Sequence, residues 1–543
     1  MTGTRAEVMW RVVRDPQLLR IQSSFAGFAF AEHATWLAML VYAYERGGIA
    51  EAGVVSVVQL APAVVLAPFA AYAGDRFRPE RVLALGYTAQ AVSMFVTAAA
   101  MWADRPLLAY AAGAAVATCV TFSRPVMGAI LPVVARTPND LVAAVVITGL
   151  TEYLGMFVGP LAAGFLLIDG TPALVFAVCA VVVGVSALLS SRLRLRHDHL
   201  PGALAIDAGG VVAEMFGGLR AIGAHGTLRV LVALIATGAL TYGVADVLMV
   251  TFSESRLGAG GGAAGLLGAG LGIGAVLGAV ASAGLIGRSR LVPYLVASAL
   301  LTTIPYLVLT GIDRLLPAVV MFLALGAGQS LLSVATGVGI QRSAPDRAVA
   351  RIFGVSEGLQ MALMAVGSLL LSVLVSVLGL DTALALIGAV AAVGLLLGAA
   401  RFRQLGGDVP PPPDHVVERV LADPVFAYLG GPAAAHLADR VEILGAQPGD
   451  VVITEGEPGD RYYLVVDGLL VATIGGEVVG EMSAGDSFGE IALLRDVPRA
   501  ATVTCVTAVE LYAISRDDFL VTVTGHPRSL ATVTQIADGL APL

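Results

Sequence analysis

A short segment near the C-terminus places one carboxylate and one guanidinium nine residues apart, on either side of a turn. Arg499 can hold a phosphate through two parallel hydrogen bonds, and Glu490 can accept a hydrogen bond from a sugar hydroxyl. Gly489 removes the side chain where a ligand must approach the backbone, and a short helix starting near Glu490 would direct free N–H groups at an anion. A phosphate and a ribose in one small pocket indicate a nucleotide. The full segment consists of two runs, Phe488-Gly489-Glu490-Ile491-Ala492 and Pro498-Arg499-Ala500-Ala501.

These two runs resemble the phosphate-binding cassette of the cyclic nucleotide-binding domain family. The resemblance implies that Glu490 holds the ribose 2′-hydroxyl and Arg499 holds the cyclic phosphate. An upstream stretch from Gly449 to Gly468 is similar to the glycine pattern of the same family, so the resemblance covers about residues 425–525 and implies a β-roll. Family members with Thr directly after the cassette Arg favour cyclic GMP, and Ala500 stands there in this chain. The resemblance therefore implies cyclic AMP as a regulatory ligand, with no cofactor.

The rest of the chain has the composition of a membrane protein. Hydrophobic residues make up 57% of the 543 residues, charged residues make up 13%, and the mean hydropathy is +0.85. Residues 407–543 carry seven Arg and 20 acidic residues, which predicts a solvated acidic domain that binds no nucleic acid. The scattered cysteines, Cys119, Cys179 and Cys505, form neither a disulfide framework nor a metal-binding spacing. We expect no metal site, and no constellation typical of an enzyme is evident.

Apolar runs of about 20 residues recur often enough to predict a polytopic membrane protein. Each is long enough to cross a hydrocarbon core of about 30 Å as a helix. The longest polar gap between them, about residues 192–228, divides them into two sets of six. The predicted spans are 24–44, 53–74, 82–102, 107–133, 140–168, 172–191, 229–252, 262–287, 291–311, 316–340, 353–379 and 381–400.

The distribution of Arg predicts the orientation in the membrane. Loops from odd-numbered to even-numbered spans hold four Arg, namely Arg46, Arg105, Arg256 and Arg314, whereas the opposite side holds twenty. By the positive-inside rule, both termini are cytoplasmic. The absence of Lys among the 32 basic residues is typical of a GC-rich bacterial genome, so we expect a bacterial inner-membrane protein.

Two six-helix halves joined by a polar loop resemble the major facilitator superfamily. The loop from Asp75 to Arg81 is similar to that family's cytoplasmic G-x-x-x-D-R-x-G-R-[RK] motif, although Ala71 and Arg78 stand at two glycine positions. The stretch Gly155 to Gly164 resembles the G-P-x-x-G-G motif of the exporter branch. A glycine-rich stretch over 258–278 lacks the strand and acidic residue of a nucleotide-binding loop, so we interpret it as close helix packing.

Ionisable residues within the predicted spans mark candidate transport residues, because a charge at bilayer depth costs roughly 2.5–3.5 kcal/mol or more. In the resembled fold, spans 1, 4, 7 and 10 line a central cavity, which favours Glu32, Arg124 and Asp246. Arg124 could instead neutralise Glu32 or Glu152 as a structural pair, and His33 could pack against a neighbouring helix. The candidates for transport and proton coupling are Glu32, His33, Arg124, Glu152 and Asp246, and those for a cytoplasmic gate are Asp75, Arg76, Arg81 and Glu357.

Together these features predict an all-α membrane protein of twelve helices in two bundles, followed by a C-terminal β-roll with flanking helices. We expect bundles at 1–205 and 206–406, a proline-rich linker at 407–424 and the nucleotide-binding domain at 425–543. The predicted function is a secondary transporter that exports an unknown small molecule in exchange for protons under cyclic AMP control. The alternative is a membrane-anchored cyclic AMP receptor or scaffold without transport activity.

Overall fold

The computed structural model divides the chain into two compact units, Met1–Asp408 and Val409–Leu543. Each unit has its own hydrophobic clusters. The structure describes residues 15–76, 78–134, 138–193, 217–282, 290–344, 349–406, 412–429, 434, 437–525 and 527–539.

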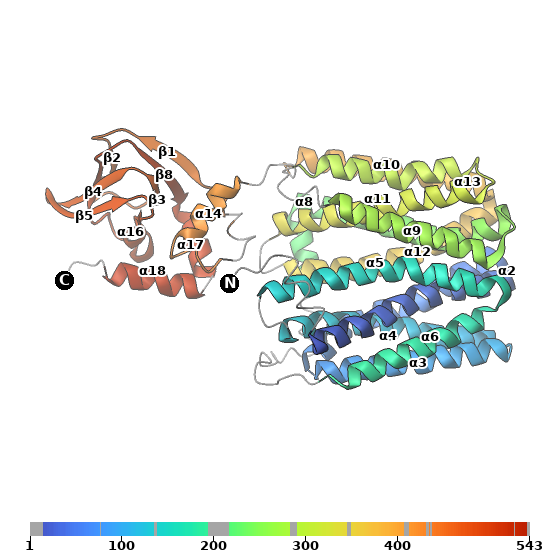
Figure 1. Ribbon diagram of the computed structural model, residues 1–543. Coiled ribbons are helices and arrows are strands. Elements are labelled where there is room, and N and C mark those ends of the chain that lie inside the picture. The colour runs from blue at the N-terminus through green and yellow to red at the C-terminus, as the bar shows by residue number, and fades with distance from the viewer. Residues whose placement is uncertain are drawn as a thin grey trace. The chain divides into compact units, whose positions relative to one another are not determined.

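The first unit is built of long apolar helices (Figure 1). Eleven helices in the described part of the chain are long and apolar enough to cross a membrane. Several begin with Pro in the first turn, where the missing N–H has no intrahelical partner in any case. The helices are α2 Pro16–Arg76, α3 Pro79–Trp102, α4 Pro106–Val134, α5 Pro138–Asp169, α6 Pro172–Ser191, α8 Gly226–Thr251, α9 Gly260–Ser282, α10 Val292–Leu309, α11 Leu315–Ser343, α12 Val349–Leu378 and α13 Leu380–Gln404, with a π-helical turn, η2 Phe252–Arg256, after α8.

Helix α2 accounts for two of the predicted spans. Its 61 residues are interrupted at Gly47 and Gly48, and Gly48 has a φ of +63° that favours glycine. Counting its two segments separately gives the expected six spans before the central loop and six after it. The helix also begins earlier than predicted, because the carboxylate of Asp15 accepts hydrogen bonds from the Gln17 and Leu18 N–H groups. Glu32 therefore lies about four turns into its helix.

Small residues bring the two halves of the bundle into contact. Figure 1 shows the first six spans in blue to cyan beside the last six in green to orange. The halves meet along α5 with α9 and along α2 with α12. A Cβ added to Gly164 would lie 2.7 Å from Gly265 Cα, and one added to Gly272 would lie 2.6 Å from Met156 O. Within the second half, a Cβ added to Gly274 would lie 1.9 Å from Leu323 O of α11. The interpretation of residues 258–278 as close helix packing is therefore confirmed.

Large apolar side chains on the outer faces of these helices are exposed. Leu107 is 84% exposed, Phe165 is 75% exposed and Leu85 is 70% exposed. Exposed apolar side chains of this size suit contact with lipid, since their exposure to water is unfavourable.

The second unit is a roll of two four-stranded antiparallel sheets with helices. One sheet has the order β1-β8-β3-β6 and the other has the order β2-β7-β4-β5. The strands are β1 Glu442–Ala446, β2 Val451–Ile453, β3 Arg461–Asp467, β4 Leu469–Ile474, β5 Glu477–Ser483, β6 Ser487–Phe488, β7 Thr502–Cys505 and β8 Val509–Ser515, and the helices are α14 Asp414–Ala422, α16 Glu490–Arg495, α17 Arg516–Gly525 and α18 Pro527–Gly539.

The helices of this unit pack on the roll through a shared apolar cluster. Val416 and Val420 of α14 join it, as do Phe519 of α17 and Val533 of α18. We predicted a linker over 407–424, but α14 lies inside that range and is a packed part of the roll unit. The helix was not predicted because Asp414–Ala422 directly follows a run of prolines, which favours an extended segment. Residues 407–411, which include the first two prolines of that run, lie outside the described residues.

Candidate functional site

The turn before α16 forms the centre of the first candidate site. Gly489 has a φ of +101° and caps α16, which begins at Glu490 as predicted. A Cβ on Gly489 would lie 2.8 Å from Arg499 Nη1 and 3.0 Å from the carbonyl oxygen of Arg461. Both the backbone conformation and the close approach therefore require glycine at this position.

Arg499 is held in place from several directions. Its side chain lies beneath the turn and only 6% of the residue is exposed. Nη1 donates to the Gly489 carbonyl at 3.0 Å, and Nη2 donates to the Arg461 carbonyl at 2.8 Å and to Asp460 Oδ1 at 3.2 Å. The guanidinium also lies 6.0 Å from the centre of the Tyr463 ring. These contacts orient the guanidinium before any ligand arrives, which lowers the entropy cost of binding an anion.

Glu490 is buried beside the same turn. Only 4% of it is exposed, and its Oε2 has no hydrogen-bond partner among the described residues. Burial raises the pKa of the Glu490 carboxyl, and the nearby Asp423 carboxylate raises it further. An unpartnered buried acceptor carries a desolvation penalty, which a hydroxyl donor from a ligand would relieve.

The other cassette residues frame these two. Phe488 is buried and stacks on Tyr463, with ring centroids 5.1 Å apart. Ala492 is buried close to Gly459, Ile491 and Ala501 are half-buried, and Ala500 is exposed.

Sequence reasoning missed several residues that support this site. Asp460 pairs with Arg499, and it stands in the upstream glycine pattern, where its spacing from the cassette gave no signal of contact. Asp423 is 2% exposed and accepts a hydrogen bond from Tyr462 Oη at 3.1 Å. Burial raises the pKa of the Asp423 carboxyl. Asp423 directly follows α14, and Tyr462 lies on β3. Their hydrogen bond therefore connects the end of α14 to the sheet.

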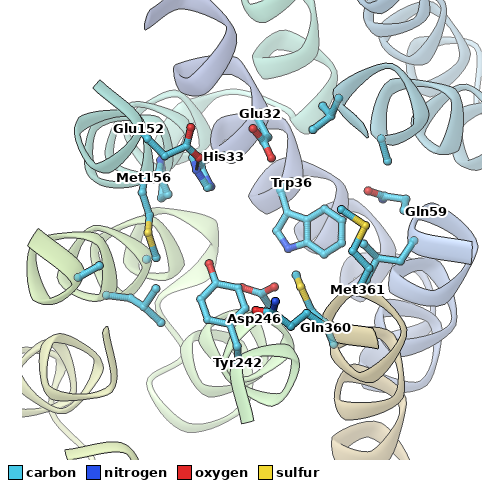
Figure 2. A pocket seen from close by; sticks show the side chains of 18 of the residues that line it. Glu32, His33, Trp36, Gln59, Glu152, Met156, Tyr242, Asp246, Gln360 and Met361 are labelled. Carbon is cyan, nitrogen blue, oxygen red and sulfur yellow. Dashed lines mark ion pairs between the residues drawn. The ribbon is translucent and has the colours of Figure 1, made fainter. Parts of the chain in front are cut away.

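The helical bundle encloses a second candidate site, a cavity of about 420 Å³ between the two halves (Figure 2). Spans from both halves contribute lining residues, including Thr121 of α4, Asp246 of α8 and Ser330 of α11. Asp246 is 3% exposed. Glu32, His33 and Glu152 also line the cavity, and one potential ligand atom from each lies within 4.8 Å of the others. His33 Nε2 lies 3.7 Å from Glu152 Oε1.

The remaining sequence candidates are placed as follows. Glu357, which we grouped with the gate, lines the cavity together with Gln360 on the same helix. Arg81 is exposed in the first turn of α3. Asp75 and Arg76 end α2, and Arg124 lies on α4, but the side chains of these three lie outside the described part of the structure. Sequence reasoning missed the aromatic lining residues Trp36 and Tyr242, because an aromatic residue in an apolar span gives no signal of facing a cavity.

Curated relatives match the second unit. The cAMP-dependent protein kinase regulatory subunit of Yarrowia lipolytica is 44% identical over 98 residues, which cover 18% of this chain and 26% of that protein. The regulatory subunit of Dictyostelium discoideum is 43% identical over 91 residues, which cover 15% of this chain and 28% of that protein. The chain thus spans about a quarter of the length of these curated relatives.

Structural and family comparisons account for the first unit. The crystal structure of the nucleoside transporter NupG has a TM-score of 0.60 at 13% identity, and the match covers 72% of this chain and 100% of that one, which shows a shared fold. The family model of the cyclic nucleotide-binding domain matches residues 445–524. The family model of the Major Facilitator Superfamily matches residues 23–363, more than half of the chain. The chain therefore belongs to the major facilitator superfamily and carries a cyclic nucleotide-binding domain in its C-terminal part.

Proposed function

We propose that this chain is a secondary transporter that exports a small molecule in exchange for protons and whose transport is regulated by cyclic AMP. The observation that carries the proposal is the geometry of the cassette. Arg499 and Glu490 are both buried beside Gly489, which has a left-handed backbone conformation. The same chain contains a cavity within a major facilitator bundle, and four carboxylates are among the described residues that line it. A nucleotide site on a transporter has a regulatory use only if binding favours one conformation of the bundle.

Cyclic AMP is the ligand that the site favours. An anionic phosphate suits the oriented guanidinium of Arg499, and a ribose hydroxyl suits the unpartnered oxygen of Glu490. Ala500, directly after the cassette Arg, offers no hydroxyl to a guanine base. The relatives from Yarrowia lipolytica and Dictyostelium discoideum are named as regulatory subunits of a cAMP-dependent kinase, which favours the same nucleotide.

Proton coupling rests on the buried carboxylates of the cavity. Asp246 is buried at the cavity wall, and Glu32 lies in the middle of its helix facing the same space. A carboxyl group in such a place can exchange a proton during each transport cycle, because it can be neutral in one conformation and charged in the other. The glycine motif from Gly155 to Gly164 favours the exporter direction.

We place the protein in a bacterial inner membrane with both termini in the cytoplasm, where cyclic AMP is available. The excess of Arg in the even-to-odd loops favours this orientation. Within the second unit, α18 packs near α16, so that ligand binding at Glu490 can move the C-terminal helix. We propose that this C-terminal helix closes over the pocket as a lid, with Ile536 or Leu540 covering the base. The side chains of both residues lie outside the described part of the structure.

A vesicle experiment tests the transport part of this proposal without a known substrate. Inverted membrane vesicles that contain the protein are given a mixture of bacterial metabolites and an inside-acid pH gradient, and accumulated solutes are identified by mass spectrometry. We expect at least one solute to accumulate only with the gradient and the wild-type chain. Failure of every solute to depend on the chain, across several metabolite mixtures, would favour the receptor without transport.

A further inference from the structure

The cavity between the two halves is lined by several carboxyl groups. Of the described residues that line it, four are carboxylates and one is a histidine. Were Arg124 and a protonated His33 each to neutralise one carboxylate, two would still remain. The lining carboxylates are Glu32, Glu152, Asp246 and Glu357.

Asp246 is the carboxylate whose environment points most directly to a ligand. It is 3% exposed, and its Oδ2 has no hydrogen-bond partner among the described residues. The indole of Trp36 and the imidazole of His33 are the polar neighbours that interact with this carboxylate. A buried carboxylate oxygen without a partner carries a substantial desolvation cost, which an opposite charge in the cavity offsets. Because Asp246 belongs to the cavity wall, a bound cation would lie in the right place to supply that charge.

Aromatic and thioether side chains surround this carboxylate. Figure 2 shows Trp36 and Tyr242 on adjacent sides of Asp246, with Met156 and Met361 further along the wall. Aromatic faces attract organic cations, and thioethers adapt to apolar bodies of different shapes. A small inorganic ion would use neither of these features.

We infer that the cavity binds an organic cation with an apolar, preferably aromatic, body, whose positive centre lies against Asp246 between Trp36 and Tyr242. The volume of about 420 Å³ falls in the range of small-molecule sites and far exceeds the space that a bare metal ion needs. An anion of the same shape would face several carboxylates. The inference rests on the proposed function only in taking this cavity as the substrate site.

Equilibrium binding to the full-length protein in detergent tests this inference. The probe is radiolabelled tetraphenylphosphonium, with unlabelled triphenylphosphine oxide, a neutral analogue, as the competitor. Binding of tetraphenylborate, a matched anion, is measured in a separate sample without the cation, because the two ions pair with each other. We expect saturable binding of the cation and at least tenfold weaker binding of the anion and the neutral compound. The measurement needs no flux, proton gradient or nucleotide, so its outcome is separate from that of the vesicle experiment.

Variants locate the binding site. Asp246→Asn keeps the shape of the side chain and removes its charge, and we expect at least a tenfold loss of affinity. Trp36→Leu should weaken binding roughly fivefold or more, as expected for loss of a desolvated cation–π contact. The matched control is Asp313→Asn, which removes an exposed acid outside the cavity and should leave affinity unchanged. The Tm of each variant shows whether it is folded.

The inference is overturned if the cation does not bind, if tetraphenylborate measured separately binds with equal affinity, or if folded Asp246→Asn and Trp36→Leu both bind like the wild type. A titration with Zn²⁺ distinguishes an organic cation from a metal ion as the ligand, because Glu32, His33 and Glu152 could offer three ligand atoms. Stoichiometric Zn²⁺ binding that depends on His33, in a protein that does not bind tetraphenylphosphonium, would identify a metal ion as the ligand instead.

Discussion

We predict that nucleotide affinity depends most on Arg499. Its guanidinium is oriented by two backbone carbonyls and by Asp460, so Arg499→Ala removes a charge that is already in place for the phosphate. We expect this change to cost roughly 2–5 kcal/mol of binding free energy. Glu490→Ala should cost less, because it removes a contact to a neutral hydroxyl. Calorimetric titration of residues 409–543 with cyclic AMP measures both effects.

Arg440→Ala provides the matched control for this titration. Arg440 lies in the same unit, its side chain is half exposed, and it pairs with Asp518 away from the cassette. Its removal should leave the affinity for cyclic AMP unchanged. Equal affinities of the wild type and Arg499→Ala would show that the cassette does not bind the phosphate as we describe.

The buried Glu490 should also make the stability of the free unit depend on pH. Burial raises its pKa in the folded state, so the folded state binds more protons than the unfolded state above about pH 4.3, the ordinary pKa of Glu. The free energy of unfolding contributed by this group therefore falls as the pH rises from there through the raised pKa. We expect Glu490→Gln to be more stable than the wild type at neutral pH. Its free energy of unfolding should also decrease less steeply as the pH rises.

Chemical denaturation of residues 409–543 without ligand, at a series of pH values, measures this dependence. Asp423, whose pKa is raised by burial, should keep part of the decline in the Glu490→Gln variant. Glu481→Gln changes an exposed carboxylate on β5 and serves as the control. If the free energy of unfolding depends on pH in the same way in the wild type and in Glu490→Gln, the carboxyl group of Glu490 is not buried without a partner as described.

At the scale of elements, contact between α5 and α9 should limit which side chains the bundle accepts. Gly164 lies so close to Gly265 that a side chain there must displace backbone atoms. We expect Gly164→Val to destabilise the full chain by about 1–3 kcal/mol, as overpacking does, and to lower its Tm in detergent. Gly149→Val on the same helix is the control, because a Cβ at Gly149 meets no atom within 4 Å. Equal Tm values for the two variants would argue against the close α5–α9 contact.

The sequence predicted the elements well where a strong physical constraint acts on a long segment. Apolar length alone identifies each spanning helix, and Gly270, Gly274 and Gly278 recur at the spacing that brings α9 against α11. Element boundaries were less certain. The start of α2 depends on the cap at Asp15, and α14 is a short amphipathic helix that the prolines before it obscured.

Only those site residues that belong to a local sequence motif could be predicted from the sequence. The turn at Gly489 and the start of α16 at Glu490 form a local pattern, so their place in the fold could be predicted from the sequence. Contacts between distant segments are different. Asp460 reaches Arg499 from 39 residues away, and Trp36 meets Asp246 only because spans from the two halves converge on one cavity. No spacing in the sequence encodes these distances.

At the scale of the whole molecule, nucleotide binding to the second unit must be coupled to the conformation of the first unit if the nucleotide controls transport. Cyclic AMP can shift the equilibrium between inward-facing and outward-facing bundles only by its difference in affinity for the two states. A coupling of about 1–3 kcal/mol would change that equilibrium by roughly 5- to 150-fold. By linkage, cyclic AMP and a transported solute should change each other's equilibrium affinity by the same factor.

The most direct test of cyclic AMP control is solute flux in proteoliposomes with the nucleotide present or absent on the side of residues 409–543. The solute is one that accumulates in the inverted-vesicle experiment, and the proteins are the wild type, Arg499→Ala and Arg440→Ala. We predict that saturating cyclic AMP changes the rate at least fivefold in the wild type and Arg440→Ala and leaves Arg499→Ala unaffected. A wild-type rate that is the same with and without cyclic AMP, in a preparation shown to bind it, would contradict the account.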